Sequence, residues 1–236
     1  MTMTIPDSQV TPIALGAMGK VFLVQGDSGA ILVDTGMPGQ AGQILDALVA
    51  RGVAPETIRL ILITHGHVDH IGGARELRER TGAPVAIHAG DAAGLRGEED
   101  LAAKAVPTSR LFGMLMRMGA RLASPGQDCA LEPDIVFDAA WRLDAYGVAG
   151  EVIPTPGHSP GSVSLLLDNG EAIVGDLVMG HMFFPKRQMP PRIAWDLQRN
   201  WESLRAVLDR QPKIVYITHG QAFAPEVLQQ LLTQYA

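Results

Sequence analysis

Leu60-Ile61-Leu62-Ile63-Thr64-His65-Gly66-His67-Val68-Asp69-His70 joins a short apolar run to a dense group of metal-binding side chains. The run 60–63 is uncharged and rich in branched aliphatic residues, which predicts a buried strand of a covered sheet. The potential ligands that follow are His65, His67, Asp69 and His70. Imidazole and carboxylate groups bind zinc, iron or manganese. The spacing therefore predicts a metal site where the strand ends and the next helix begins.

The composition predicts a packed globular protein. The chain has 236 residues, of which 47% are hydrophobic and 19% charged, and it shows no repeats or disordered composition. Its net charge of −6 argues against a general nucleic-acid binder. No apolar run is long enough to cross a membrane. We therefore expect a small-molecule substrate as the partner, with no nucleic acid and no membrane.

The cellular location is expected to be cytoplasmic. The stretch Met1–Asp7 has neither the basic start nor the apolar core of a signal peptide. Cys129 is the single cysteine, so the chain cannot form an internal disulfide.

Strands and helices alternate along the chain. Strands are expected at 20–25, 30–33, 60–63 and 85–87, and later at 135–137, 141–143, 150–153, 162–167, 172–174 and 213–217. Helices are expected at 40–51, 71–81, 195–209 and 225–235. Two β-rich halves, each followed by helices, predict an α/β fold with two sheets packed together and helices outside. We see no separating linker, so residues 1–236 are expected to form one domain.

The segment at about 91–124 interrupts this alternation. Leucine and methionine recur at helical spacing within 109–122. We expect a helical cap or insertion there. Its methionines either line an adaptable substrate pocket or pack as ordinary core contacts. Its apolar surface would also allow two copies to pair as a homodimer.

Three further potential ligands complete the pattern: His158, Asp176 and His219. Each follows an apolar strand and lies beside a glycine, where the backbone can approach closely. This shared position is what one site at one edge of a sheet stack requires. His88 also ends a strand, but we interpret it as structural. His181, five residues after Asp176, either lines the pocket or lies outside it.

With these motifs in order from Asp34 to His219, the chain resembles the metallo-β-lactamase-fold superfamily. The resemblance implies an αββα sandwich of two mixed β-sheets and a dinuclear metal site. It places His65, His67 and His158 on the first metal, and Asp69, His70 and His219 on the second, with Asp176 bridging the two. Two zinc ions are expected, with iron and manganese as alternatives. Asp34 would orient a ligand or cap the following turn.

The resemblance also implies hydrolytic chemistry. Two metals would share a water as a bridging hydroxide that attacks the substrate, with Asp69 and Asp176 as the catalytic carboxylates. The bridge at Asp176 and the absent export signal argue against a secreted β-lactamase, and His67 argues against the flavin-linked diiron reductases. Glyoxalase II-type thioesterases share the bridge, but many carry a histidine at the position of Ser162. We predict a glyoxalase II- or lactonase-like hydrolase of a small ester, thioester or lactone.

Other activities stay open. A mononuclear iron persulfide dioxygenase shares the fold, a phosphodiesterase is a further alternative, and a non-catalytic binding module would not need so many ligands. For specificity, we expect residues 177–192 to form a wall for an apolar acyl chain, with Phe183 and Phe184 at its centre.

Overall fold

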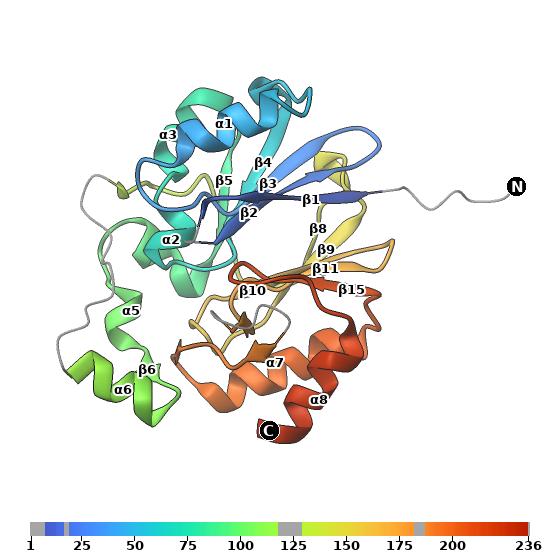
Figure 1. The fold of residues 1–236 in the computed structure, drawn as a ribbon. Coiled ribbons are helices and arrows are strands. Elements are labelled where there is room, and N and C mark those ends of the chain that lie inside the picture. The colour runs from blue at the N-terminus through green and yellow to red at the C-terminus, as the bar shows by residue number, and fades with distance from the viewer. Residues whose placement is uncertain (1–7, 17–18, 118–128, 182–186, 236) are drawn as a thin grey trace, which may run out of the picture.

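The computed structural model describes residues 8–16, 19–117, 129–181 and 187–235. Two sheets pack face to face, with helices on both outer faces (Figure 1). The predicted αββα sandwich is confirmed. Among the described residues, no helix is long and apolar enough to cross a membrane.

The first sheet is mixed. Its order is β1-β2-β3-β4-β5-β7, with bounds Gln9–Ala14, Lys20–Gln25, Ala30–Val33, Ile58–Leu62, Val85–His88 and Ile135–Phe137. The pairs among β1, β2 and β3 are antiparallel, and those from β3 through β7 are parallel. Parallel strands end at the same edge, so β3, β4 and β5 all deliver their following loops to one place.

The second sheet is also mixed. Its order is β15-β11-β10-β9-β8, with bounds Ile214–Tyr216, Glu171–Ile173, Val163–Leu167, Gly150–Pro154 and Trp141–Arg142. Only β11 and β15 pair in parallel. Because β11 and β15 run side by side in one direction, the residues after both strands reach the same edge.

The apolar run 60–63 covers the end of β4 and the residue after it, whereas the exposed Arg59 lies earlier in the strand. Leu60 and Leu62 pack into the core between the two sheets, whereas Ile61 and Ile63 pack into the core beneath the outer helices. Alternate side chains of a strand point to opposite faces, and both faces of this strand are covered. Each fully buried aliphatic side chain contributes roughly 1.5–3 kcal/mol relative to exposure. The buried strand β4 therefore fixes the position of the residues that follow it.

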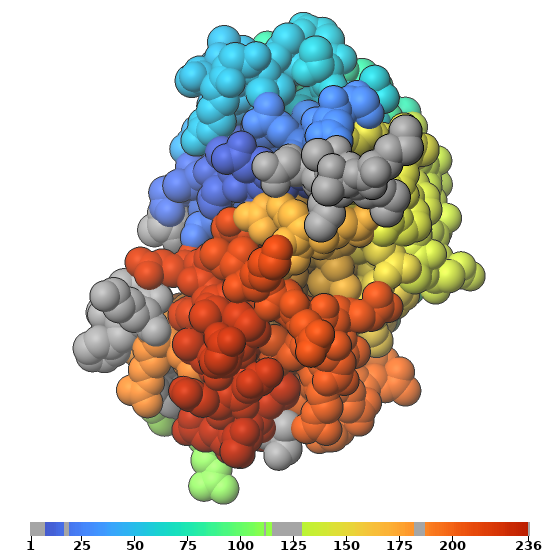
Figure 2. All heavy atoms as spheres, turned by 90° about the vertical axis from the view of Figure 1, so that its right-hand side faces the viewer, coloured from blue at the N-terminus to red at the C-terminus, as the bar shows by residue number. Residues whose placement is uncertain are grey.

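The outer faces of the sandwich are covered by amphipathic helices. α1 (Ala41–Val49) and α3 (Ala74–Thr81) cover the first sheet, while α7 (Leu197–Asp209) and α8 (Pro225–Tyr235) cover the second. Figure 2 shows the same division from the side, with the N-terminal part of the chain, in blue and cyan, above and the C-terminal part, in orange and red, below. Ile44 and Leu48 of α1 are fully buried, as is Leu204 of α7. The apolar stripes predicted for these helices thus face the core.

The helix expected at 71–81 is instead two helices, α2 (Val68–Ile71) and α3, which meet at Gly72 and Gly73. A Cβ at Gly72 would lie 2.4 Å from the Pro38 nitrogen, and one at Gly73 would lie 2.5 Å from the Thr35 carbonyl oxygen. The loop after β3 therefore presses directly on the backbone at this bend. As a result, Asp69 and His70 lie on a helix rather than on the turn before it.

The predicted insertion holds α4 (Ala92–Leu95), α5 (Leu101–Lys104), β6 (Val106–Pro107) and α6 (Arg110–Arg117). Ala92 and Leu95 belong to the core under the outer helices, whereas α5 and α6 stand beside the second half of the molecule (Figure 1). The remainder of the helix expected at 109–122 lies outside the described residues. The assignment of residues 1–236 to one domain stays a prediction.

Several short elements join these parts. Strand β6 pairs with β14 (Ile193–Ala194), and β12 (Met179–Gly180) pairs with β13 (Gln188–Met189). Single 3-10 turns are η2 (Pro55–Thr57), η3 (Ala89–Asp91) and η5 (Asp144–Tyr146). Leu101 of α5 is buried against Gly66, where an added Cβ would lie 2.6 Å from Leu101 Cδ1. The insertion is thus anchored directly on the histidine loop.

Candidate metal centre

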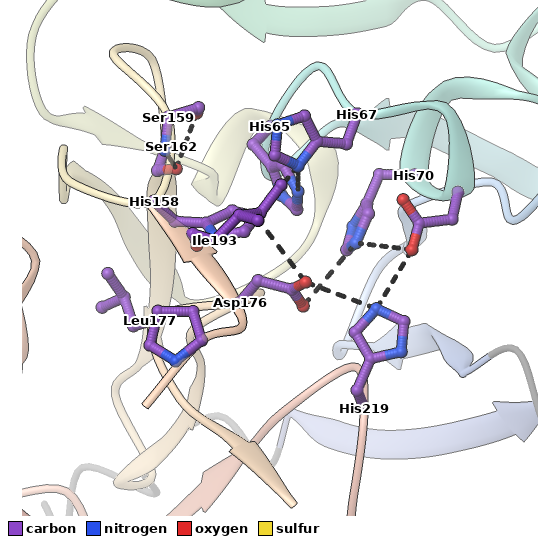
Figure 3. Close-up of polar contacts among 12 residues, drawn as sticks. His65, His67, His70, His158, Ser159, Ser162, Asp176, Leu177, Ile193 and His219 are labelled. Carbon is purple, nitrogen blue, oxygen red and sulfur yellow. Dashed lines mark hydrogen bonds and ion pairs between the residues drawn. The ribbon is translucent and has the colours of Figure 1, made fainter. Parts of the chain in front are cut away.

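All seven side chains predicted as ligands lie together at one edge of the sandwich (Figure 3). The loop after β4 supplies His65 and His67, α2 supplies Asp69 and His70, and the β9–β10 loop supplies His158. Asp176 follows β11 and His219 follows β15. Three sets of potential ligand atoms lie within 4.8 Å of one another: His65, His67 and His158; His65, His70 and Asp176; and Asp69, His70 and His219. The strand ends therefore bring the residues together as their spacing predicted.

The first part of the site is the three-histidine group of His65, His67 and His158. His67 Nδ1 lies 3.2 Å from His65 Nε2 and 2.9 Å from His158 Nε2. All three side chains are buried. One nitrogen of each ring therefore points at the same small volume.

The second part, the carboxylate group, contains Asp69, His70, Asp176 and His219. Asp176 Oδ2 lies 3.7 Å from His158 Nε2 and 3.3 Å from His219 Nε2. Asp176 Oδ1 lies 3.6 Å from His70 Nε2, and Asp69 Oδ2 lies 3.1 Å from His219 Nε2. Asp176 thus stands between the three-histidine group and the other three residues.

Neighbouring backbone and side-chain groups fix how two of the rings point. His158 Nδ1 lies 3.0 Å from the Ile193 carbonyl oxygen of β14, and it can only donate to that acceptor. His70 Nδ1 likewise faces Asp34 Oδ2 at 2.8 Å. In both rings Nδ1 is therefore directed away from the centre, and the Nε2 atom is directed into it.

Asp34 contacts the ring of His70, a candidate ligand, and not only the turn that follows it. It is fully buried, has φ of 65°, and accepts hydrogen bonds from the backbone and hydroxyl of Thr64 as well as from His70. An aspartate tolerates this left-handed conformation better than most residues. Of the two roles left open by the sequence, the contacts support orientation of His70.

The three-histidine group favours neutral rings. Burial, followed by the neighbouring imidazoles, holds the pKa of His65 well below its usual value. Burial and His67 lower the pKa of His158 to about 4. Burial also lowers the pKa of His67. At neutral pH these rings therefore present lone pairs, which is the form that binds a metal.

The carboxylate group has the opposite electrostatics. Burial acts to lower the pKa of His219, but Asp176 and Asp69 outweigh it and raise that pKa to about 9. Burial also acts to lower the pKa of His70, but Asp34, Asp69 and Asp176 together outweigh it and raise that pKa well above its usual value. Burial would raise the pKa of Asp69, yet His70 and His219 lower it to about 2. Two ionised carboxylates thus attract positive charge into this half of the site.

Several buried polar atoms of the site lack hydrogen bonds to other described residues. They are His67 Nε2, His70 Nε2, His219 Nε2 and Asp176 Oδ1. Of these atoms, His70 Nε2 and Asp176 Oδ1 lie 3.6 Å apart and His219 Nε2 lies 3.1 Å from Asp69 Oδ2, so they contact one another or Asp69 only as ion pairs. Three of the four belong to the carboxylate group, where they surround the space between Asp69 and Asp176.

Sequence reasoning missed three residues that support the site. Asp91 is fully buried and contacts both the His65 loop and the His158 loop. Ile193 acts through its carbonyl group, which no sequence pattern reports. Asn200 donates to the Leu177 carbonyl oxygen beside Asp176 and is fully buried. A signal for Asp91 was present, because Gly90-Asp91 follows a strand just as the predicted ligands do.

The two remaining histidines lie outside the candidate metal groups. His88 accepts a hydrogen bond from the Gly90 backbone and contacts the Phe137 ring edge-on, which fits a structural role. The backbone of His181 donates to the Arg187 carbonyl oxygen. Phe183 and Phe184 lie outside the described residues, so the proposed acyl wall stays a prediction.

The comparison with family models gives one description, the metallo-beta-lactamase superfamily, matched by residues 16–219. That range contains all seven residues of the centre. It also contains the insertion and both sheets except for β1.

Curated relatives are similar over much of the chain. A probable metallo-hydrolase of Bacillus subtilis, YflN, is 28% identical over 222 residues, which are 87% of this chain and 81% of that protein. A hydroxyacylglutathione hydrolase of Anaeromyxobacter dehalogenans is 35% identical over 161 residues, which are 68% of this chain but only 46% of that protein.

Solved structures share the fold. The archaeal superfamily protein ST1585 from Sulfolobus tokodaii matches with a TM-score of 0.67 at 23% identity, covering 97% of this chain and 86% of that one. TTHA1623, solved in a di-iron-bound form, matches with a TM-score of 0.66 at 26% identity, covering 94% and 98%.

Proposed function

Because the chain belongs to the metallo-β-lactamase superfamily and is a metallo-hydrolase of that kind, we propose that it uses two metal ions to hydrolyse a small thioester, ester or lactone. The observation that carries this proposal is the convergence of seven ligand side chains on one buried volume.

The residues fit metal ions rather than a hydrogen-bonded network. A tetrahedral zinc ion with bonds of roughly 2.0–2.1 Å to nitrogen separates its ligand nitrogens by about 3.3–3.4 Å. The nitrogens of the three-histidine group lie at 3.2 and 2.9 Å, close to that spacing. The neutral rings of the three-histidine group and the ionised carboxylate of Asp69 are the protonation states that bind a cation, and a cation would give partners to the buried atoms that lack hydrogen bonds.

We assign the ligands to two positions. His65, His67 and His158 would hold one metal, and Asp69, His70 and His219 the other, with Asp176 reaching both. Metals in these positions would lower the pKa of a water molecule towards neutrality and polarise the bond under attack.

The substrate would approach past Asp69 and His219, because their side chains are the most exposed of the ion-paired residues in the centre. Their exposed fractions are 25% and 17%, whereas those of His70, His158 and Asp176 are 0%, 3% and 6%. Asp69 stays ionised at neutral pH because His70 and His219 outweigh the effect of burial on its pKa. Its carboxylate can therefore accept a hydrogen bond from the attacking water and orient it.

The metal is proposed to be zinc, with iron as the main alternative. Histidine and carboxylate ligands accept either ion. The similar protein TTHA1623 binds two irons, which supports the number of metals more than their identity.

A thioester is the substrate class that we favour. An acyl glutathione is a thioester, and one relative is named for cleaving such a molecule. A thioester also needs little help for its leaving group, since a thiolate leaves readily at neutral pH. The sequence of that relative extends well beyond the aligned part, so glutathione itself is not implied.

The test is hydrolysis by metal-loaded protein of matched acyl compounds that differ only in the bond cleaved. A thioester, an oxygen ester, a lactone and a phosphodiester form one panel. The proposal expects the thioester to have the highest kcat/KM and a chelator to abolish turnover. Cleavage of the phosphodiester alone would refute it.

A further inference from the structure

A buried carboxylate outside the ligand set joins two of the loops that carry ligands. Asp91 Oδ2 accepts hydrogen bonds from the Gly66 backbone N–H at 2.8 Å and from the Ser159 hydroxyl at 2.5 Å. Asp91 Oδ1 accepts one from the Gly161 backbone N–H at 2.6 Å. Gly66 lies between His65 and His67, and Ser159 follows His158. The Asp91 side chain therefore joins the loop that carries His65 and His67 to the loop that carries His158.

The carboxylate is held without a cation. Asp91 is fully buried, and its hydrogen-bond donors among the described residues, Gly66, Ser159 and Gly161, are uncharged groups. Burying a carboxylate costs several kcal/mol unless strong hydrogen bonds compensate. The three donors supply such bonds, and hydrogen bonds to a charged acceptor are about twice as strong as neutral ones. Because burying the Asp91 carboxylate is costly, its presence is better explained by the loop positions that it fixes than by a gain in stability alone.

Around Asp91 the backbones of three segments approach one another closely at glycines. A Cβ at Gly161 would lie 2.5 Å from the Asp91 nitrogen, and one at Gly90 would lie 2.8 Å from the Gly161 nitrogen. A Cβ at Gly66 would lie 3.1 Å from the Asp91 carbonyl oxygen. The three segments therefore touch through their backbones, and the hydrogen bonds to Asp91 set their spacing.

Ser159 extends the connection through the turn that carries His158. Its backbone N–H donates to the Ser162 hydroxyl at 3.0 Å, and the two hydroxyl oxygens lie 2.7 Å apart (Figure 3). The Ser162 hydroxyl therefore belongs to the Asp91 network.

We propose that Asp91 is a positioning residue for the metal centre, which sets the distance between His67 and His158 by joining Gly66 to Ser159 and Gly161. The relevant nitrogens lie 2.9 Å apart although the two residues are 91 positions apart in the chain. The inference rests on the metal-binding part of the proposed function. It does not depend on which substrate is cleaved.

The experiment measures zinc affinity by competition with a chelator, together with the absorption spectrum of the cobalt(II) form. The variants are Asp91→Asn, which keeps the shape, and Ser159→Ala, which removes one hydrogen bond. Zinc binding is expected to show one phase for each metal position. His158→Ala should remove the phase of the three-histidine group, and His219→Ala should remove the phase of the carboxylate group. We expect Asp91→Asn and Ser159→Ala to weaken the phase lost in His158→Ala by roughly tenfold or more and to change the cobalt spectrum.

The matched control is Asp134→Asn. Asp134 also joins separate elements, accepting from the Val85 backbone and from Arg78, but it lies away from the centre. Asp134→Asn should lower the Tm and leave the zinc affinity and the cobalt(II) spectrum unchanged. If Asp91→Asn does not fold, Ser159→Ala decides the question.

The inference is overturned if the folded Asp91 and Ser159 variants bind zinc as tightly as the wild type and give the same cobalt(II) spectrum. Failure of the wild type to hydrolyse any acyl compound would instead contradict the proposed function, and the affinity comparison would still test Asp91. A wild-type protein that binds no metal would overturn both.

Discussion

His70 donates from Nδ1 to Oδ2 of Asp34 across 2.8 Å, although the two residues are 36 positions apart in the chain. This bond directs the opposite nitrogen of His70 into the metal centre. Asp34→Asn keeps a residue that tolerates φ of 65° but removes the charge. We expect metal affinity to fall about 10- to 100-fold, measured by chelator competition. Unchanged affinity would show that Asp34 serves the turn and not the ligand.

Asp69→Asn should abolish hydrolysis while leaving the fold intact. The substitution preserves size but removes the ionised carboxylate beside His219, which we assign to one metal position and to the orientation of water. General-base and orienting groups contribute roughly 10²–10⁴-fold, so we expect a fall of that order in kcat/KM with little change in Tm. Asp144→Asn is the matched control, because Asp144 pairs with Arg142 on the surface. A variant of Asp69 as active as the Asp144 control would contradict the role given to it.

Leu101→Ala should loosen the insertion more than it affects the core. Leu101 is 4% exposed and packs on Gly66 and Gly94. A buried leucine replaced by alanine costs about 2–5 kcal/mol where the site cannot collapse. Here the loss should appear as faster proteolysis within residues 101–117 and a raised KM.

Leu77→Ala provides the comparison for Leu101, since Leu77 is fully buried in the core under α1 and α3. It should lower the Tm with no change in KM. If the Leu101 variant shows the same pattern as the Leu77 variant, the insertion does not contribute to substrate binding.

Tyr216 should give the protein a distinct loss of stability at high pH. Burial and a 2.7 Å hydrogen bond to Glu171 raise its pKa to about 12, from an ordinary value of 10.0. Folding therefore favours the neutral phenol, and this contribution is complete below about pH 10 and disappears as pH approaches 12. In urea unfolding, the difference between wild type and Tyr216→Phe should be constant up to pH 10 and then shrink. A difference that stays constant to pH 12 would contradict the raised pKa.

Much of the fold was predictable because its sequence patterns have direct physical causes. Both faces of β4 are covered, so every residue of the run 60–63 is apolar. The stripe of α7 faces the core, and that helix begins two residues later than expected because Asp196 caps it by accepting from the Arg199 backbone N–H. The ligand residues were predictable because each follows a strand, and the topology brings those strand ends to one edge.

Strand β1 was not predicted, because Pro12 lies inside it and proline lowers strand propensity. β1 lies at the edge of the sheet, where a proline is tolerated because one side of an edge strand has no neighbouring strand. The pairing of β6 with β14 involves only two residues on each strand, too few for a periodic signal.

The supporting contacts of the centre were not predictable for a different reason. Asp91 meets Ser159 across 68 positions, and their approach depends on glycines whose packing no local pattern reports. The carbonyl group of Ile193 is common to every residue type, so only the structure reveals that it orients His158.

The central claim is that two metal ions act together in this centre, and stepwise metal loading tests it most directly. Metal-free protein is titrated with zinc, and bound metal and thioester hydrolysis are measured on the same samples. The account predicts that hydrolysis rises until two zinc ions are bound per chain and then stays constant. A protein that binds one iron, consumes oxygen with a persulfide and hydrolyses no thioester at any zinc loading would contradict it.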